Sequence, residues 1–203
     1  MPREIIVSPE FDRPRATTEW SPDAIISIVS PRTEVPAEPT LPHLVLRFHD
    51  VESISRPREM HRAGRHNSHH RPSRKTAPRL VLPARESVET LIAFAAQHPG
   101  RILVHCNHGV SRAPAAALAI ARASWPAPGW AGHASALAAL FPDAQPNMLM
   151  IALAASILGD DPQDAIDDVV AALPTRDRLP WGARGISPGA IRWHLAEPKG
   201  PPV

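Results

Sequence analysis

The residues in this chain best suited to chemistry are a cysteine and an arginine close behind it. Cys106 is the only cysteine, and five residues separate it from Arg112. An apolar strand is predicted over residues 102–104 and a helix from about Arg112, so a short loop joins them. Such a loop can curl until its backbone N–H groups point at one centre, forming an anion site at a helix N-terminus. Arg112 can then hold two oxygens of a tetrahedral oxyanion. We therefore expect the cysteine loop, defined as residues 106–112, to bind such an anion.

The same surroundings favour a reactive sulfur. Converging N–H groups, a helix dipole and a guanidinium all stabilise a thiolate, so we expect the pKa of Cys106 to lie well below the free value of about 8.5. A thiolate beside a bound oxyanion is a nucleophile in attack position. The alternative is that Cys106 is a small buried hydrophobic residue, as most free cysteines are. In that case Arg112 is an ordinary helix arginine.

The loop sequence resembles the H-C-x5-R phosphate loop of cysteine-dependent protein tyrosine and dual-specificity phosphatases. The residues that carry the resemblance are His105, Cys106, Asn107, His108, Gly109, Val110, Ser111 and Arg112. The Leu-Arg-Phe-His-Asp run at 46–50 is similar to that of a bacterial subgroup of predicted tyrosine phosphatases. The resemblance covers about residues 22–159. It implies an α/β fold with a small, mostly parallel central sheet flanked by helices. It also implies hydrolysis of phosphate monoesters, with protein phosphotyrosine foremost.

The resemblance assigns a role to several positions. Cys106 is the nucleophile that forms a phosphocysteine, and Arg112 binds the phosphoryl oxygens. His105 orders the loop and tunes the thiolate, while His108 shapes the mouth of the pocket. The remaining loop residues, Asn107, Gly109, Val110 and Ser111, surround the phosphate, with Gly109 allowing a turn that a Cβ would block. Asn147, in a Pro-Asn pair that opens a late helix, is expected to brace the loop.

Asp50 is our candidate for the general acid that protonates the leaving group. It follows a predicted strand, at the sheet edge where the loops of an α/β fold gather. It lies 56 residues before Cys106, which becomes 32 when the 24 residues of segment 56–79 are subtracted. Glu52 is a possible substitute. The alternative for Asp50 is a residue that caps a turn after the strand.

Ala113 departs from the family pattern, which has Ser or Thr after the loop arginine. That hydroxyl hydrogen-bonds the departing thiolate when water cleaves the phosphocysteine. Losing such a bond costs about 1.5–3 kcal/mol, or roughly 10- to 100-fold in the second step. We therefore expect slow turnover, with Ser111 as a hypothetical substitute. The alternative is a catalytically impaired pseudophosphatase that binds phosphorylated ligands.

No cofactor or metal is implied by the resemblance. A metal site built from His105, Cys106 and His108 is a further interpretation, but no matching ligand cluster with zinc-type spacing accompanies it. Sulfur transfer and arsenate reduction use a similar loop. Arsenate reduction normally needs additional resolving thiols, and Cys106 is the only cysteine.

The elements that must position the loop can be read from hydrophobic patterning. Strands are predicted over 24–29 and 44–48, both as core strands of a parallel sheet, and residues 5–7 are a possible edge strand. Helices are predicted over 84–98, 113–124, 133–140 and 147–158, with a shorter helical piece around 165–173.

The chain of 203 residues suits one domain with flanking segments. We predict an N-terminal extension over 1–21, a phosphatase-like domain over 22–159 and a Pro-rich tail over 160–203. Segment 56–79 holds seven Arg and one Lys against one Glu, a charge of +7 that leaves −5 for the remainder of a +2 chain. It is a solvated loop, a contact for a polyanion such as nucleic acid or anionic lipid, or a metal site formed by His61, His66, His69 and His70.

The compartment follows from the cysteine and the apolar runs. A reactive thiol persists best in a reducing environment, and the N-terminus lacks the apolar core of a signal peptide. No run approaches the roughly 18 apolar residues of a membrane span. We expect a cytoplasmic protein whose partner is a phosphorylated protein or another phosphate monoester.

Overall fold

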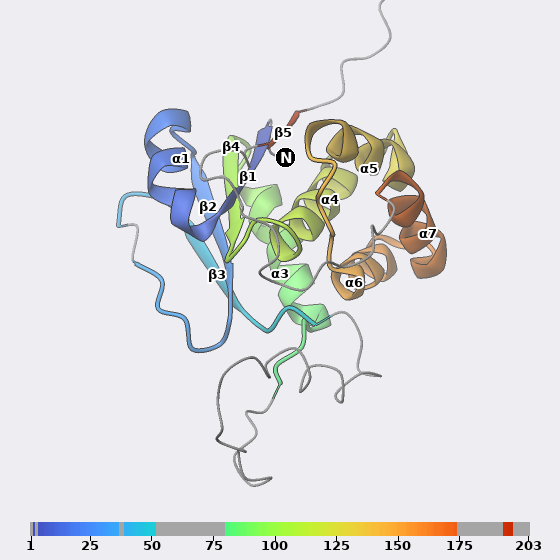
Figure 1. The fold of residues 1–203 in the computed structure, drawn as a ribbon, viewed down its shortest axis with the longest axis horizontal. Coiled ribbons are helices and arrows are strands. Elements are labelled where there is room, and N and C mark those ends of the chain that lie inside the picture. Colours follow the sequence, from blue (N-terminus) through green and yellow to red (C-terminus); the bar gives the residue numbers. More distant parts are fainter. Residues whose placement is uncertain (1, 3, 37–38, 52–79, 174–192, 197–203) are drawn as a thin grey trace, which may run out of the picture.

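The computed structural model describes residues 2, 4–36, 39–51, 80–173 and 193–196 (Figure 1). Within these ranges strands and helices alternate along the first half and helices dominate the second. The elements are β1 (Glu4–Pro9), the 3-10 turn η1 (Glu10–Asp12), α1 (Arg13–Trp20), β2 (Ala24–Val29), β3 (His43–Arg47), α3 (Arg85–Gln97), β4 (Arg101–Cys106), α4 (Arg112–Ser124), α5 (Gly129–Leu140), α6 (Met148–Leu158), α7 (Pro162–Ala172) and β5 (Trp193–Ala196).

The sheet has the order β3-β2-β4-β1-β5. The first four strands are parallel to one another, and β5 runs antiparallel to β1 at the edge. Because the carboxyl ends of parallel strands meet at one edge, the end of β4 lies between the ends of β1 and β2. This places Cys106, the last residue of β4, at the centre of that edge. The expected mostly parallel sheet flanked by helices is confirmed.

Helices cover the sheet unequally, and each face has its own hydrophobic cluster. Figure 1 shows α1 on one side of the sheet and α3–α7 on the other. Ile102, Val104 and Cys106 belong to the large cluster under α3–α7, while Leu103 belongs to the small cluster under α1. This alternation along β4 follows from the period of two in a strand. It means that the neighbouring residues His105 and Cys106 face opposite sides of the sheet.

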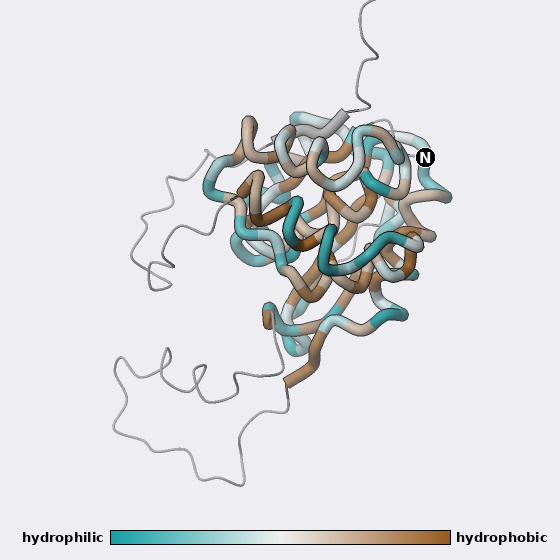
Figure 2. Tube along the Cα trace, turned by 90° about the vertical axis from the view of Figure 1, so that its right-hand side faces the viewer, coloured by the Kyte–Doolittle hydropathy of each residue, from teal (hydrophilic) through white to brown (hydrophobic). Residues whose placement is uncertain are grey.

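Helix α4 is the most enclosed element. Its first ten residues, from Arg112 to Ala121, are all buried, and six of them are alanines. Small side chains allow the helix to approach β1, β4 and α6 closely, so the start of α4 is held rigidly at the end of β4. Figure 2, which views the helical side, shows hydrophilic outer turns with hydrophobic stretches between and behind them.

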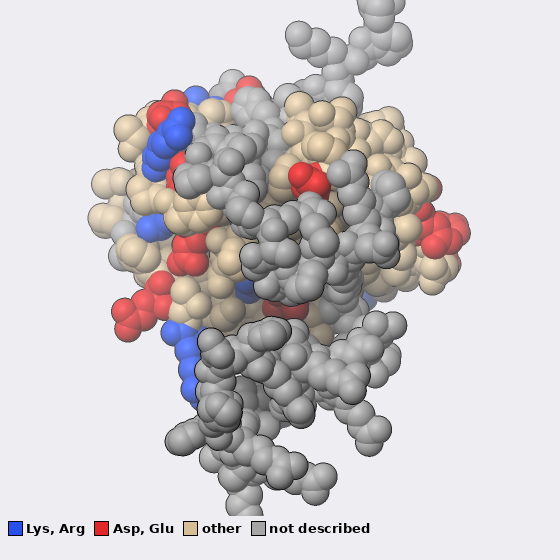
Figure 3. Space-filling view, viewed as in Figure 1, with Lys and Arg blue, Asp and Glu red and all other residues tan. Residues whose placement is uncertain are grey.

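Exposed charged side chains gather over two of the helices. Figure 3 shows acidic side chains over α7 and a mixture of acidic and basic ones over α1. Helix α7 begins at Pro162 behind Asp161, whose side chain accepts hydrogen bonds from the N–H groups of Gln163 and Asp164. No helix among the described residues is long and apolar enough to cross a membrane.

Three positional predictions need correction. Residues 5–7 form part of β1, which is an interior strand between β4 and β5 rather than an edge strand, so the sheet begins inside the predicted N-terminal extension. The strand predicted at 44–48 is the edge strand β3. The helix predicted at 133–140 starts four residues earlier, at Gly129.

The predicted tail also contributes to the fold. Helix α7 packs against α5 and α6, and β5 pairs with β1. The predicted strand 24–29 and the helices predicted at 84–98, 113–124 and 147–158 agree with β2, α3, α4 and α6 to within one residue at each end. The basic segment 56–79, with its four histidines, and Glu52 lie outside the described residues.

Candidate active site

The cysteine loop turns tightly between β4 and α4. Gly109 has a φ of 70°, and a Cβ built there would lie 2.9 Å from the backbone nitrogen of Pro9. Both the left-handed conformation and the close approach require glycine. The turn predicted at Gly109 is present, and the structure adds a close contact with β1, which packs directly against the loop.

Cys106 is enclosed at the base of the loop, where only 2% of its surface is exposed. Burial raises the pKa of its thiol, while the charge of Arg112 and the backbone N–H groups of Ala113 and Gly109 act in the opposite direction. Asp50 adds to the increase through its negative charge. The expected low pKa is therefore wrong for the ligand-free protein, because removing the sulfur from water outweighs the positive groups around it.

Alkylation of Cys106 by iodoacetamide tests this pKa. Because the raised pKa keeps the sulfur protonated at neutral pH, we expect slow alkylation there and a rate that still rises above pH of about 8.5. The same chain unfolded in urea serves as the control, since its only cysteine then has an ordinary pKa. A rate that is already maximal below pH of about 7 in the folded protein would show a low pKa instead.

Arg112 is held by the end of β3. Its Nη1 donates a hydrogen bond to the carbonyl oxygen of Phe48 over 2.9 Å, and its Nε lies 3.9 Å from Oδ2 of Asp50. The residue is 3% exposed, and its buried Nε has no hydrogen-bond partner in the described part of the chain. A buried, unpaired guanidinium N–H is rare and costly in a folded protein. An oxyanion in the loop would satisfy it.

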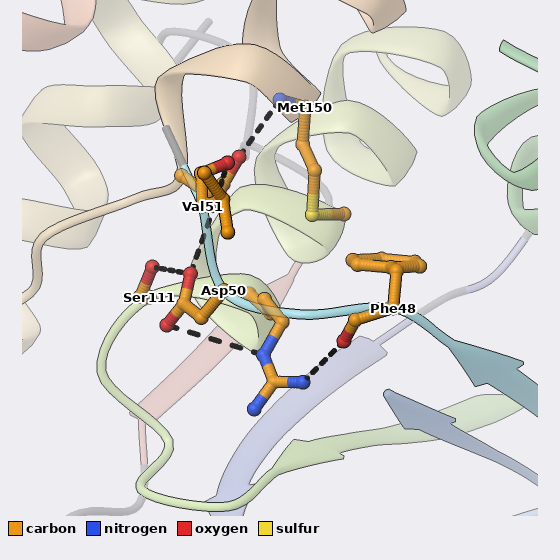
Figure 4. A network of polar contacts seen from close by, with 7 residues as sticks. Phe48, Asp50, Val51, Ser111 and Met150 are labelled. Atoms are coloured by element: carbon orange, nitrogen blue, oxygen red, sulfur yellow. Dashed lines mark hydrogen bonds and ion pairs between the residues drawn. The ribbon is translucent and has the colours of Figure 1, made fainter. Parts of the chain in front are cut away.

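Asp50 lies beside the loop, at the start of the segment that follows β3 (Figure 4). Its Oδ1 accepts hydrogen bonds from Oγ of Ser111 over 2.7 Å and from Nδ2 of Asn147 over 2.9 Å. Oδ2 makes no hydrogen bond to a described residue, and its neighbour is the guanidinium of Arg112. The side chain is 22% exposed. One oxygen is thus fixed by two donors, and the other faces the guanidinium of Arg112.

Asn147 joins three segments. Its backbone N–H donates to the carbonyl of Ser111 over 3.3 Å, which braces the loop directly. Its side chain donates to Asp50 and to the carbonyl of Val51, and its Oδ1 accepts from the N–H of Met150 as the N-cap of α6. A second brace comes from Gln145, whose N–H donates to the carbonyl of Val110 over 2.8 Å.

His105 faces away from the sulfur. Its Nε2 lies 2.5 Å from Oγ of Ser27 on β2, and Ser27 also contacts Nε2 of His43 over 2.7 Å. Burial, together with the positive charges of Arg13 and His43, lowers the pKa of His105 to about 3. The imidazole is therefore neutral, and it links strands on the α1 side of the sheet instead of reaching the loop.

This position excludes the three-residue metal site formed by His105, Cys106 and His108, because adjacent residues of β4 point to opposite faces. No group of three or more His, Cys, Asp or Glu side chains in the described ranges is arranged to hold a metal ion.

The other loop residues differ in their exposure. The carbonyl of Asn107 accepts a hydrogen bond from the N–H of Glu10 over 3.3 Å, and His108 is exposed at the crown. Val110 is half-buried, and Ser111 is buried. The single hydroxyl proton of Ser111 is donated to Asp50. In this arrangement Ser111 does not supply the hydrogen bond to sulfur that Ala113 lacks, contrary to the hypothesis drawn from the sequence.

Three residues that contribute to the site, Pro9, Ser27 and Phe48, were not predicted from the sequence. The carbonyl of Phe48 and the backbone of Pro9 act through main-chain atoms, which leave no signal in residue type. Ser27 did leave one: it is a polar residue in the otherwise apolar strand β2, and a buried hydroxyl needs a partner.

Comparison with known proteins agrees with this architecture. No family model and no curated protein matches the chain. Among solved structures, it is similar to the crystal structure of DUSP15, a dual-specificity phosphatase, with a TM-score of 0.55 and 16% sequence identity. The match covers 84% of this chain and 92% of that one. At such low identity the likeness shows the fold alone. The chain has a dual-specificity-phosphatase-like fold, with its only cysteine at the end of a central strand.

Proposed function

We propose that the protein hydrolyses phosphate monoesters, with protein phosphotyrosine foremost, through a phosphocysteine on Cys106. The observation that carries the proposal is the buried Arg112, whose Nε has no hydrogen-bond partner among the described residues, at the opposite end of the loop from the cysteine. Arg112 already has an ion pair with Asp50, but its unpartnered N–H can still donate to an oxyanion in the loop, and its charge acts on the nucleophile Cys106. The dual-specificity-phosphatase-like fold supports the same reading.

The chemistry proceeds in two displacements. In the first, the Cys106 thiol gives its proton to a non-bridging oxygen of the bound phosphate, and the resulting thiolate attacks phosphorus. The bond from phosphorus to the ester oxygen breaks, and that oxygen takes a proton from Oδ2 of Asp50. Arg112 holds the phosphoryl oxygens and stabilises their charge in the transition state. In the second, water attacks phosphorus, Asp50 accepts a proton from it, and the thiolate leaves with release of inorganic phosphate.

Pre-steady-state kinetics with p-nitrophenyl phosphate test the proposal. We expect a burst of one nitrophenolate per protein, followed by a slow steady state, because Ala113 provides no hydroxyl for the departing thiolate. Ala113→Ser should raise the steady-state rate about 10- to 100-fold. Ala115→Ser is the matched control, since Ala115 is equally buried on the same helix. Absence of both burst and turnover, with inorganic phosphate still bound, would contradict the proposal and favour a pseudophosphatase.

Asp50→Asn tests the general acid with little disturbance of the site. The asparagine oxygen can still accept the hydrogen bonds of Ser111 and Asn147, but its amide group cannot deliver a proton as the acid does. We expect kcat/KM, which reports the first displacement, to fall about 100-fold or more for an alkyl phosphate, whose leaving group needs a proton, and much less for p-nitrophenyl phosphate. Asp50→Ala, which also removes both hydrogen bonds, should impair both substrates. Equal rates of Asp50→Asn and the unaltered protein on the alkyl ester would remove Asp50 from the mechanism.

The partners and compartment belong to the same proposal. The substrate is a phosphorylated protein or another phosphate monoester, no cofactor takes part, and the site works in a reducing compartment, which we take to be the cytoplasm. Segment 56–79 is proposed to attract polyanionic substrates. Activity on a multiply phosphorylated substrate that is unchanged from low to high salt would contradict that attraction.

A further inference from the structure

Phe11 is an aromatic side chain that the fold leaves in water. It is 57% exposed, the largest value among the exposed large hydrophobic residues of the described chain. Its neighbours in sequence, Asp12 and Arg13, are buried. Hydrophobic side chains are usually buried and charged ones exposed, but here the two charged residues are buried and the phenyl ring points outward. An exposed ring does not gain the free energy that comes from removing apolar surface from water. Packing therefore does not explain the position of Phe11.

The turn that carries Phe11 is attached to the cysteine loop. Phe11 is the middle residue of η1, directly after β1. The N–H of Glu10 donates to the carbonyl of Asn107, and the backbone of Pro9 packs against Gly109. The residues before Phe11, Pro9 and Glu10, are thus fixed to the cysteine loop, and the residues after it, Asp12 and Arg13, are buried in the protein.

The sheet register sets an upper limit on the distance from the nucleophile. Pro9 is paired with Cys106 across neighbouring strands. With strands about 4.8 Å apart and at most about 3.8 Å between successive Cα atoms, the Cα atom of Phe11 lies within about 12 Å of that of Cys106. Both residues are at the carboxyl edge of the sheet. The other phenylalanine at this edge, Phe48, is 1% exposed and cannot meet a ligand.

We propose that Phe11 is a specificity-determining residue that contacts the aromatic ring of an aryl phosphate such as phosphotyrosine. The inference rests on the proposed function, because a ring reaches Phe11 only when its phosphate is held in the cysteine loop. The phosphate places the ester oxygen toward the mouth of the loop, and the group beyond that oxygen lies at the edge where Phe11 is exposed. Two aromatic rings attract each other in offset or edge-to-face geometry, whereas an alkyl ester offers no ring to contact. Phe11 therefore favours phosphotyrosine over phosphoserine.

Ligand binding to Cys106→Ser protein tests this without turnover. Titration calorimetry compares phenyl phosphate with ethyl phosphate, which share the phosphate and differ in the ring. Phe11→Ala is expected to weaken phenyl phosphate about three- to tenfold and to leave ethyl phosphate unchanged. Phe11→Trp should keep the preference, and Phe11→Leu should lose most of it. Leu140→Ala is the matched control, because Leu140 is 53% exposed on α5.

The outcomes separate the inference from the proposed function. Equal loss for the two esters, no loss for either, or the same loss in Leu140→Ala would overturn the role of Phe11. If the unsubstituted protein shows the burst, but Phe11→Ala does not change the preference for phenyl phosphate, the role of Phe11 is wrong. The proposed function then stands. Failure of both esters to bind would overturn the inference and the proposed function together.

Discussion

Cys106→Ser is expected to abolish the nitrophenolate burst and to lower turnover on the order of 10,000-fold or more, while phosphate affinity stays within about threefold. The loss follows because a serine hydroxyl in this site has no adjacent base to activate it. The retained affinity follows from the raised pKa of the thiol: when the sulfur is protonated, replacing it with a hydroxyl changes no charge. Stopped-flow absorbance measures the burst, and titration calorimetry measures phosphate binding.

The phosphate affinity of Cys106→Ser also tests the raised pKa of the Cys106 thiol, independently of the burst. If Cys106 were a thiolate in the ligand-free protein, its removal would relieve a repulsion with the bound anion, and Cys106→Ser would bind phosphate far more tightly. Such tightening would show that the loop N–H groups and Arg112 outweigh burial. A burst that survives the substitution would exclude Cys106 as the nucleophile.

Arg112→Lys should lower kcat/KM for p-nitrophenyl phosphate by about 1,000-fold. Lysine keeps the positive charge, but it lacks the planar fork that holds two phosphoryl oxygens at once. It also cannot maintain the present contacts with the Phe48 carbonyl and Asp50 in the same geometry. Steady-state kinetics check the effect, and the loss should fall mainly on kcat because the fork fits the transition state best.

Arg122→Lys provides the control for this change. Arg122 lies on the same helix, α4, its Nη2 donates to Asp160 over 2.7 Å, and its Nε also lacks a partner among the described residues. It differs from Arg112 in holding the turn before α7 through Asp160, which also accepts from Nε1 of Trp130. We expect lower stability and nearly unchanged kinetics. A comparable loss of kcat/KM in both variants would mean that Arg112 acts only through the fold.

Local features of the sequence predicted much of this architecture. Residues 24–29 form an unbroken apolar run apart from Ser27, and they are strand β2 with those bounds. The small-residue helix after the loop and the Asn147 cap were likewise recognisable, because periodicity and capping act over a few residues.

Pairing between distant segments was not predictable in this way. Residues 4–9 look like a terminal strand with a proline, and only their pairing with both β4 and β5 makes them interior. The orientation of His105 was not predictable for the same reason. The sequence motif identifies His105, but the alternation of side chains along β4 directs its ring toward Ser27. The pKa of Cys106 depends on how completely the surrounding chain excludes water, which the loop sequence does not specify.

Segments from both sides of the cysteine loop in the sequence hold it in place. Pro9 and Glu10 hold it on one side, and Gln145 and Asn147 hold it on the other. Contacts so distant in sequence form only when the intervening chain has collapsed, so the loop takes its shape late in folding. A ribosome-bound chain that has not yet released residue 147 is thus incapable of forming the site. Phosphate, as a ligand of the folded state alone, should shift the unfolding equilibrium of the whole domain rather than of the loop by itself.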